Sequence, residues 1–233
     1  MRILDAHSVF HHNADPNKLD ELRAGVIDDI SFLHSRYPDV GKISATDLSS
    51  DDLMRLSERY RRLLHYGHFS LSGKRKVANE LIWKWTEASG KYVGCQFWSL
   101  KAKKLFDLEV ADCGGWPITM KAARHLESKL SKKSRPKDSR LTHEHVYPIE
   151  DMKSWLRNQG KLNRDEIRNH FERQCVGCVV LESEHDRKHG DDQNPWLRYN
   201  IAGITLAQNS AWLDAQRVLI DEVGLIESSK LCF

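Results

Sequence analysis

Two histidine clusters most constrain what this chain can fold into. The first is a His-Glu-His run at residues 143–145, followed closely by Pro148, and the second contains His185 and His189. The first run predicts a short strand that ends in a turn at the proline, and the second places both histidines on one face of a helix. Carboxylates and neutral imidazoles bind divalent metals, and histidine is also a common general base. Together the clusters could hold one metal ion and one base, which suits phosphodiester hydrolysis.

The composition is that of a globular, soluble chain. Its 233 residues, 40% hydrophobic and 30% charged, can bury a core in one large domain or two small ones. No apolar run approaches the ~20 residues of a membrane span, and the N-terminus lacks the apolar core of a secretory signal. Five cysteines are an odd number, so a disulfide scaffold is not expected. These features predict a cytoplasmic location and no membrane partner, and they leave the oligomeric state open.

Helical periodicity dominates the first half of the chain. Apolar spacing predicts helices over residues 16–36, about 75–88 and about 100–107, the last of them capped by Ser99. Two more helices are predicted to begin after the cap Ser49 and at Pro117. Residues 94–99 are expected to be a break between helices. We therefore expect a helical region over residues 1–135 that binds a substrate or a partner.

The second half of the chain alternates strand and helix patterns. Strands are predicted over 141–147 and 175–181, and helices over 149–158, over 164–174 behind the cap Asn163, over 184–189 behind the cap Ser183, over 196–199 and over about 205–220. Residues 136–233 would then form a strand, a helical insert, a second strand and a helix, followed by C-terminal helices. The expected fold class is α+β, mostly α.

A basic strip over residues 121–140 directly precedes the first histidine cluster. It holds eight basic and two acidic side chains. Such a strip beside a metal site could attract a phosphate backbone, with Lys132, Lys133 and Arg135 as candidate contacts. Arg187 and Lys188, in the second cluster, are further candidates. The alternative interpretation is a solvated helix end followed by a flexible linker.

The two clusters resemble those of the HNH, or ββα-metal, nuclease superfamily. The segment from Glu144 to Pro148 is similar to the Asp-His-Ile-x-Pro pattern that ends that family's first strand, and His185 and His189 match its helical His-x-x-x-His. The resemblance covers roughly residues 139–192. It implies that Glu144, His185 and His189 bind a divalent metal, Mg²⁺ or Mn²⁺ with Zn²⁺ or Ni²⁺ as alternatives, and that His145 is the general base.

The resemblance also implies a function for the chain. It would be a divergent bacterial or phage-borne member of the superfamily, a metal-dependent endonuclease in which His145 activates water. DNA is favoured over RNA as the nucleic-acid partner, and a role in bacterial defence is implied. The sequence specificity of cleavage is left open.

A second hypothesis is a non-catalytic nucleic-acid- or protein-binding module stabilised by zinc. Cys175 and Cys178 form a Cys-x-x-Cys pair, and with His185 and His189 they could supply four ligands to a structural zinc. The family's middle residue, usually asparagine, falls on Val176 here, which also favours this hypothesis. The pair Glu144 and His145 favours the nuclease, because a purely structural zinc would not need it.

Overall fold

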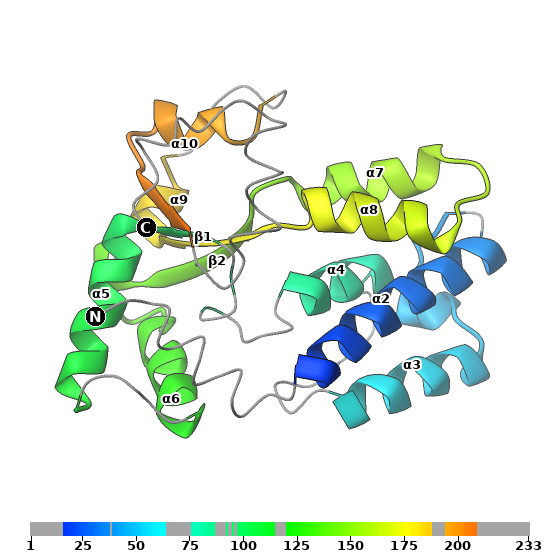
Figure 1. Ribbon diagram of the computed structural model, residues 1–233, viewed down its shortest axis with the longest axis horizontal. Helices are drawn as coiled ribbons and strands as arrows, with labels where there is room; N and C mark the ends of the chain where they lie inside the picture. Colours follow the sequence, from blue (N-terminus) through cyan, green and yellow to red (C-terminus); the bar gives the residue numbers. More distant parts are fainter. Residues whose placement is uncertain are drawn as a thin grey trace. The chain divides into compact units, whose positions relative to one another are not determined.

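The chain divides into two compact units. The computed structural model describes residues 16–37, 39–63, 76–86, 92, 95, 97–114, 120–187 and 194–208. Unit 1 takes its described residues from 89–146 and from 176 onward, and unit 2 takes them from 15–88 and 147–175 (Figure 1). The expected α+β, mostly helical class is confirmed. In the described part of the chain, no helix is both long and apolar enough to cross a membrane.

A small mixed sheet organises unit 1. Among the described residues it has four strands, β1 (Phe97–Ser99), β2 (Leu141–His145), β3 (Gly177–Leu181) and β4 (Leu206–Gln208), in the order β2-β3-β1-β4. Strand β3 runs antiparallel to β2 and parallel to β1, and β4 runs antiparallel to β1. The short helix α9 (Glu182–His185) follows β3 directly. Strands β2 and β3 with α9 thus give the strand, strand and helix order that the motif predicts.

Helices α5 (Leu100–Asp112) and α6 (Met120–Leu130) complete the core of unit 1 (Figure 1). Their buried side chains Phe106 and Leu126 belong to one apolar cluster with Trp98 of β1 and Val179 of β3. The rings of Trp98 and Phe106 meet edge-on at 5.3 Å between centroids, a favourable aromatic geometry. This core supports the strands that carry the histidine clusters.

Five α-helices and a 3-10 turn at Ala45–Asp47 make up the described part of unit 2. The α-helices are α2 (Pro16–Arg36), α3 (Ser50–Leu63), α4 (Val77–Thr86), α7 (Ile149–Asn158) and α8 (Arg164–Gln174). The helical insert α7–α8, which lies in the chain between β2 and β3, shares one core with the N-terminal helices through Met152 and Phe171. Phe171 meets Trp85 of α4 edge-on at 5.6 Å. The insert therefore builds unit 2, not unit 1.

Local capping chemistry explains why several helices begin where the sequence predicts. The Ser49 hydroxyl accepts the backbone N–H of Asp52 at 3.2 Å, and the Ser99 hydroxyl accepts that of Ala102 at 3.0 Å. Asn163 accepts the N–H of Glu166 at 2.9 Å, while the Glu166 carboxylate accepts the N–H of Asn163 at 2.7 Å. Such caps satisfy amide groups that have no partner inside the helix.

The division of the chain differs from the predicted boundary between residues 135 and 136. That position lies inside unit 1, where α5 and α6 share a core with β3. The segment 131–140 also contains a 3-10 turn at Lys137–Ser139. The apolar pattern of a helix shows which face is buried, but not which distant element covers it.

Three local predictions were wrong. Residues 94–99 were predicted to be a break between helices, but Phe97–Ser99 forms strand β1, and all three of its residues are buried. The helix after β3 begins at Glu182, so Ser183 is not its cap. Leu206–Gln208 is a strand where a helix over about 205–220 was predicted, and the rest of that range lies outside the described residues.

Candidate functional site

Glu144 lies between two side chains from separate elements. Its carboxylate is 7% exposed, and Cys178 of β3 is its partner across the strand pair. The Oε1 atom accepts a 2.5 Å hydrogen bond from the hydroxyl of Tyr199, which is on α10 (Leu197–Ile201). The Oε2 atom lies 3.9 Å from Nε2 of His185 on α9. One carboxylate oxygen is thus fixed by a phenol while the other faces an imidazole.

The separation of Glu144 and His185 is close to that of two ligands of one divalent ion. In octahedral coordination at Mg²⁺ distances, two ligand atoms lie about 3.0 Å apart when adjacent and about 4.2 Å apart when opposite. The observed 3.9 Å between Oε2 and Nε2 falls between these values, so a small side-chain movement would suffice. The His185 side chain is half exposed, so an ion there would be reachable from solvent. The Nδ1 atom of His185 lies 3.9 Å from Oδ1 of Asp186, and a neighbouring carboxylate orients ligand imidazoles in many metal sites.

His145 directly follows Glu144 at the end of β2. Successive strand side chains point to opposite faces, so His143 and His145 share the face opposite Glu144. Their rings stack, with centroids 5.5 Å apart and planes 20° apart, and His145 is 7% exposed. The chain bends immediately afterwards, at residues 146–147. The structure therefore brings Glu144 together with His185, and it pairs the ring of His145 with that of His143.

Two of the predicted site residues, Lys188 and His189, lie outside the described residues. Within the described part of the chain, no group of three or more His, Cys, Asp or Glu side chains could hold a metal ion. The helix that carries His185 ends at that residue, so the described residues do not extend the predicted helical His-x-x-x-His face. Among the described residues, the structure brings the donors Glu144 and His185 together.

Cys175 and Cys178 are both buried, and they belong to different units. Cys175 belongs to the core of unit 2, where its thiol donates to the carbonyl of Ile82 at 3.5 Å, and Cys178 is in β3 of unit 1. Burial raises the pKa of both thiols well above the ordinary value. Zinc binds the thiolate form, which a bound ion would itself stabilise, so the structural zinc at these two cysteines stays a prediction.

A second buried carboxylate anchors α9 to the sheet. Glu184 is 2% exposed, and its Oε2 atom accepts the Ser99 hydroxyl at 2.5 Å and the Leu181 N–H at 3.0 Å. Ser99 is the last residue of β1 and also caps α5. The residue next to His185 is therefore fixed to the centre of unit 1. Sequence reasoning assigned no role to Glu184 or Tyr199, because no local pattern marks their partners.

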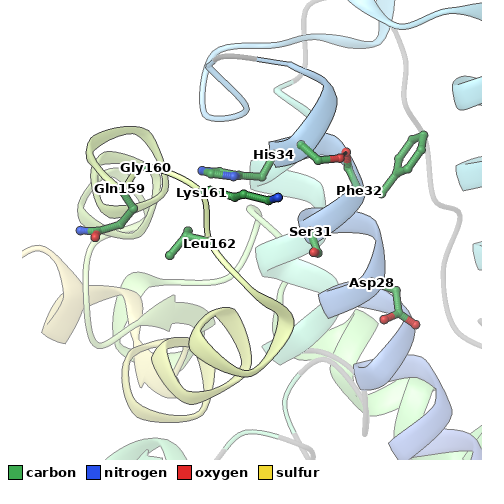
Figure 2. Close-up of a pocket in the computed structure, with 9 residues that line it drawn as sticks. Asp28, Ser31, Phe32, His34, Gln159, Gly160, Lys161 and Leu162 are labelled. Atoms are coloured by element: carbon green, nitrogen blue, oxygen red, sulfur yellow. Dashed lines mark hydrogen bonds between the residues drawn. The ribbon is translucent and has the colours of Figure 1, made fainter.

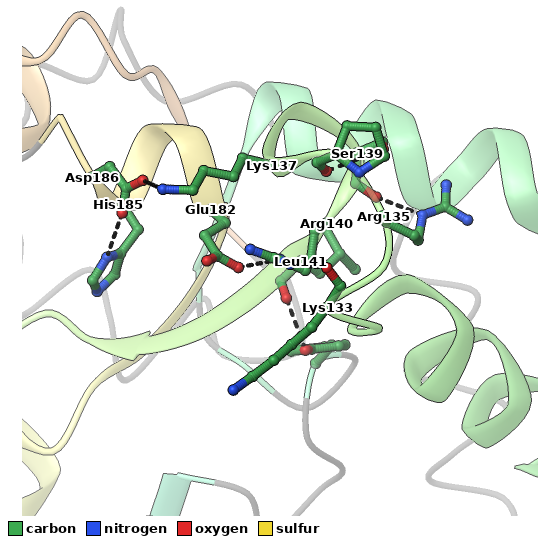
Figure 3. Close-up of polar contacts among 11 residues, drawn as sticks. Lys133, Arg135, Lys137, Ser139, Arg140, Leu141, Glu182, His185 and Asp186 are labelled. Carbon is green, nitrogen blue, oxygen red and sulfur yellow. Dashed lines mark hydrogen bonds and ion pairs between the residues drawn. The ribbon is translucent and has the colours of Figure 1, made fainter.

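Much of the basic strip is neutralised within the structure (Figure 3). Lys137 lies 2.5 Å from Asp186, and Arg140 forms an ion pair with Glu182 of α9. The ammonium of Lys137 holds the pKa of the Asp186 carboxyl below its ordinary value. These two pairs join the strip to α9.

Glu109 binds two further cations of the strip. Its carboxylate pairs with Lys129 and lies 3.1 Å from Arg135, whose Nε also donates to the Ser139 carbonyl at 2.8 Å. Both cations hold the pKa of Glu109 below its ordinary value. Lys132 and Lys133, in contrast, are exposed, and no ion pair joins them to another described residue.

A separate pocket of about 760 Å³ lies in unit 2, between α2 and the turn that joins α7 to α8 (Figure 2). Ser31, His34 and Lys161 are among its polar lining residues. His34 donates from Nε2 to the Leu156 carbonyl at 3.0 Å, and Asp28 pairs with Arg164 at 2.6 Å. The lining therefore pairs no nucleophile with a base, and we assign no chemistry to it.

Comparisons of this chain with protein-family models, with curated proteins and with solved structures gave no match. The functional argument therefore rests on the geometry of unit 1. That geometry combines an antiparallel strand pair, a short helix directly after it, and a carboxylate and an imidazole that converge from the two elements.

Proposed function

We propose that this chain is a metal-dependent endonuclease of the HNH type, which hydrolyses phosphodiester bonds of DNA, with RNA as the alternative substrate. The observation that carries the proposal is the 3.9 Å approach of Glu144 Oε2 to His185 Nε2. The two residues come from separate elements, β2 and α9, in the strand, strand and helix order of the ββα-metal motif. A buried carboxylate facing a half-exposed imidazole is a donor set that suits a divalent ion such as Mg²⁺ or Mn²⁺.

Each residue has a defined task in the proposed reaction. Glu144 and His185, with His189 from outside the described residues, would hold the ion. A bound divalent ion stabilises negative charge that develops on the phosphate. His145 would take a proton from the attacking water.

Cations near the site would bind the phosphates that flank the cut. Arg187 lies two residues after the end of α9, and its Nε donates to the Ser183 carbonyl at 3.2 Å, which leaves the rest of an exposed guanidinium for a phosphate. Lys188 is the next residue, and Lys132 and Lys133 extend the exposed positive charge. A phosphate backbone attracts such side chains irrespective of sequence.

A non-catalytic nucleic-acid-binding module is the second candidate. The observation that favours it is the stacking of the His145 ring on His143, on the strand face opposite Glu144. A module of this kind would bind nucleic acid without cleaving it.

Cleavage assays with metal titration test the proposed function. We expect the purified chain to cut DNA in Mg²⁺ or Mn²⁺ and to lose activity in a chelator. Glu144→Ala and His185→Ala should weaken metal binding, with activity partly restored by excess metal, because each variant loses one donor. Glu150→Ala and His125→Ala, at exposed positions, are matched controls and should behave like the unmodified chain. Cleavage that is indifferent to both the chelator and Glu144→Ala would contradict the proposal.

Salt dependence separates the cations that are available to a phosphate from those already paired. Replacing Lys132 and Lys133 with glutamine should weaken nucleic-acid binding and reduce the slope of log affinity against log salt by about one unit per lost contact. Arg135→Gln should change the slope less, because its guanidinium already binds Glu109. Fluorescence anisotropy with labelled duplex over a range of salt concentrations measures both. An unchanged slope in the double lysine variant would mean that these two residues are solvated and do not contact phosphate.

A further inference from the structure

Two adjacent residues of α10 contact the end of strand β2. The Nη2 atom of Arg198 donates to the carbonyl oxygens of His145 at 2.8 Å and of Val146 at 2.6 Å. The hydroxyl of Tyr199, a residue that is 1% exposed, donates to Oε1 of Glu144 at 2.5 Å. Helix α10 thus binds the backbone just after Glu144 and also the carboxylate of Glu144.

We propose that Tyr199 is a positioning residue of the candidate site, which fixes the carboxylate of Glu144 so that Oε2 faces His185. The inference rests on the proposed function insofar as it concerns metal binding. It makes α10 a fourth element of the candidate site, in addition to β2, β3 and α9. Arg198 supports this role, because its two hydrogen bonds hold α10 against the end of the strand that carries Glu144.

The chemistry of a carboxylate explains why one hydrogen bond matters. A carboxylate has two equivalent oxygens, and free rotation would present either of them, or neither, to an ion. A phenol that donates to Oε1 removes this freedom and leaves Oε2 as the available donor. Groups that orient a metal ligand in this way typically contribute a factor of about 10–100 in metal affinity.

The substitution Tyr199→Phe tests the inference, since it removes the hydroxyl and keeps the packed ring. Isothermal titration of the full chain with Mn²⁺ should show a dissociation constant about 10–100-fold higher than that of the unmodified chain. Tyr92→Phe is the matched control. Tyr92 is also 1% exposed and also donates a hydrogen bond to β2, at the Leu141 carbonyl, 3.0 Å away. Its loss should leave the Mn²⁺ dissociation constant unchanged, because Leu141 is at the opposite end of the strand from the site.

A second measurement makes the contact testable without metal. Thermal midpoints of Tyr199→Phe, Glu144→Ala and the double variant should be clearly non-additive, because each substitution removes one partner of the same hydrogen bond. A dissociation constant for Mn²⁺ that is unchanged in Tyr199→Phe would overturn the positioning role and leave the proposed function standing. Failure of the unmodified chain to bind Mn²⁺ would overturn the proposed function and, with it, the role of Tyr199 in metal binding. Additive midpoints would overturn the contact between Tyr199 and Glu144 itself.

Discussion

Replacing His145 with alanine should lower the rate of DNA cleavage about 10²–10⁴-fold, the contribution that a general base typically makes. Metal affinity should change little, because a residue that accepts a proton from water is not a ligand of the ion. The unmodified chain should also lose activity as the pH falls, since a protonated imidazole cannot accept a proton. Single-turnover cleavage rates over a range of pH, together with Mn²⁺ titrations, measure these effects.

His143→Ala is the matched control for this experiment. The two histidines are equally buried, their rings stack, and they lie on the same face of β2. If burial alone mattered, both substitutions would reduce activity through a loss of stability, which thermal midpoints would show. If His145→Ala cuts at the unmodified rate, His145 is not the base, the HNH interpretation of this chain is wrong, and the binding module becomes the better hypothesis.

The helices were predictable because their signals are local. Asn163 and Glu166 lie three residues apart and form a reciprocal cap that a reader of the sequence can find. Strand β1 was not predictable in the same way. It has only three residues, and its partners β3 and β4 lie far along the chain, so no periodicity could distinguish it from a break between helices.

The candidate site was predictable only in part, because some of its contacts join residues that lie far apart in the sequence. Glu144 and His185 belong to recognisable clusters, so the motif indicated both. Tyr199 lies 55 residues from Glu144 along the chain, and Ser99 lies 85 residues from Glu184, so neither hydrogen bond leaves a local pattern. The basic strip was visible as a run of positive charge. Its acidic partners Glu109 and Glu182 lie in other segments, and their neutralising effect could not be seen.

Ser99→Ala should lower the free energy of unfolding by about 3 kcal/mol, a large effect for the loss of one oxygen atom. The hydroxyl caps α5 through the Ala102 N–H, and such a cap is worth about 1 kcal/mol. It also donates to the buried carboxylate of Glu184, and a hydrogen bond to a charged group is worth about 1.5–3 kcal/mol. Urea denaturation, monitored by circular dichroism, measures the loss.

Ser131→Ala is the control, because its hydroxyl donates to the Ser128 carbonyl in an exposed position. Its effect should stay within about 0.5 kcal/mol, as is usual for surface substitutions. Glu184→Gln combined with Ser99→Ala should cost less than the sum of the two single changes, since they share one interaction. A loss below about 1 kcal/mol for Ser99→Ala would mean that only the helix cap, and not the link from β1 to α9, is stabilising. In that case the position of His185 would not depend on Ser99, and cleavage by the Ser99→Ala variant should equal that of the unmodified chain.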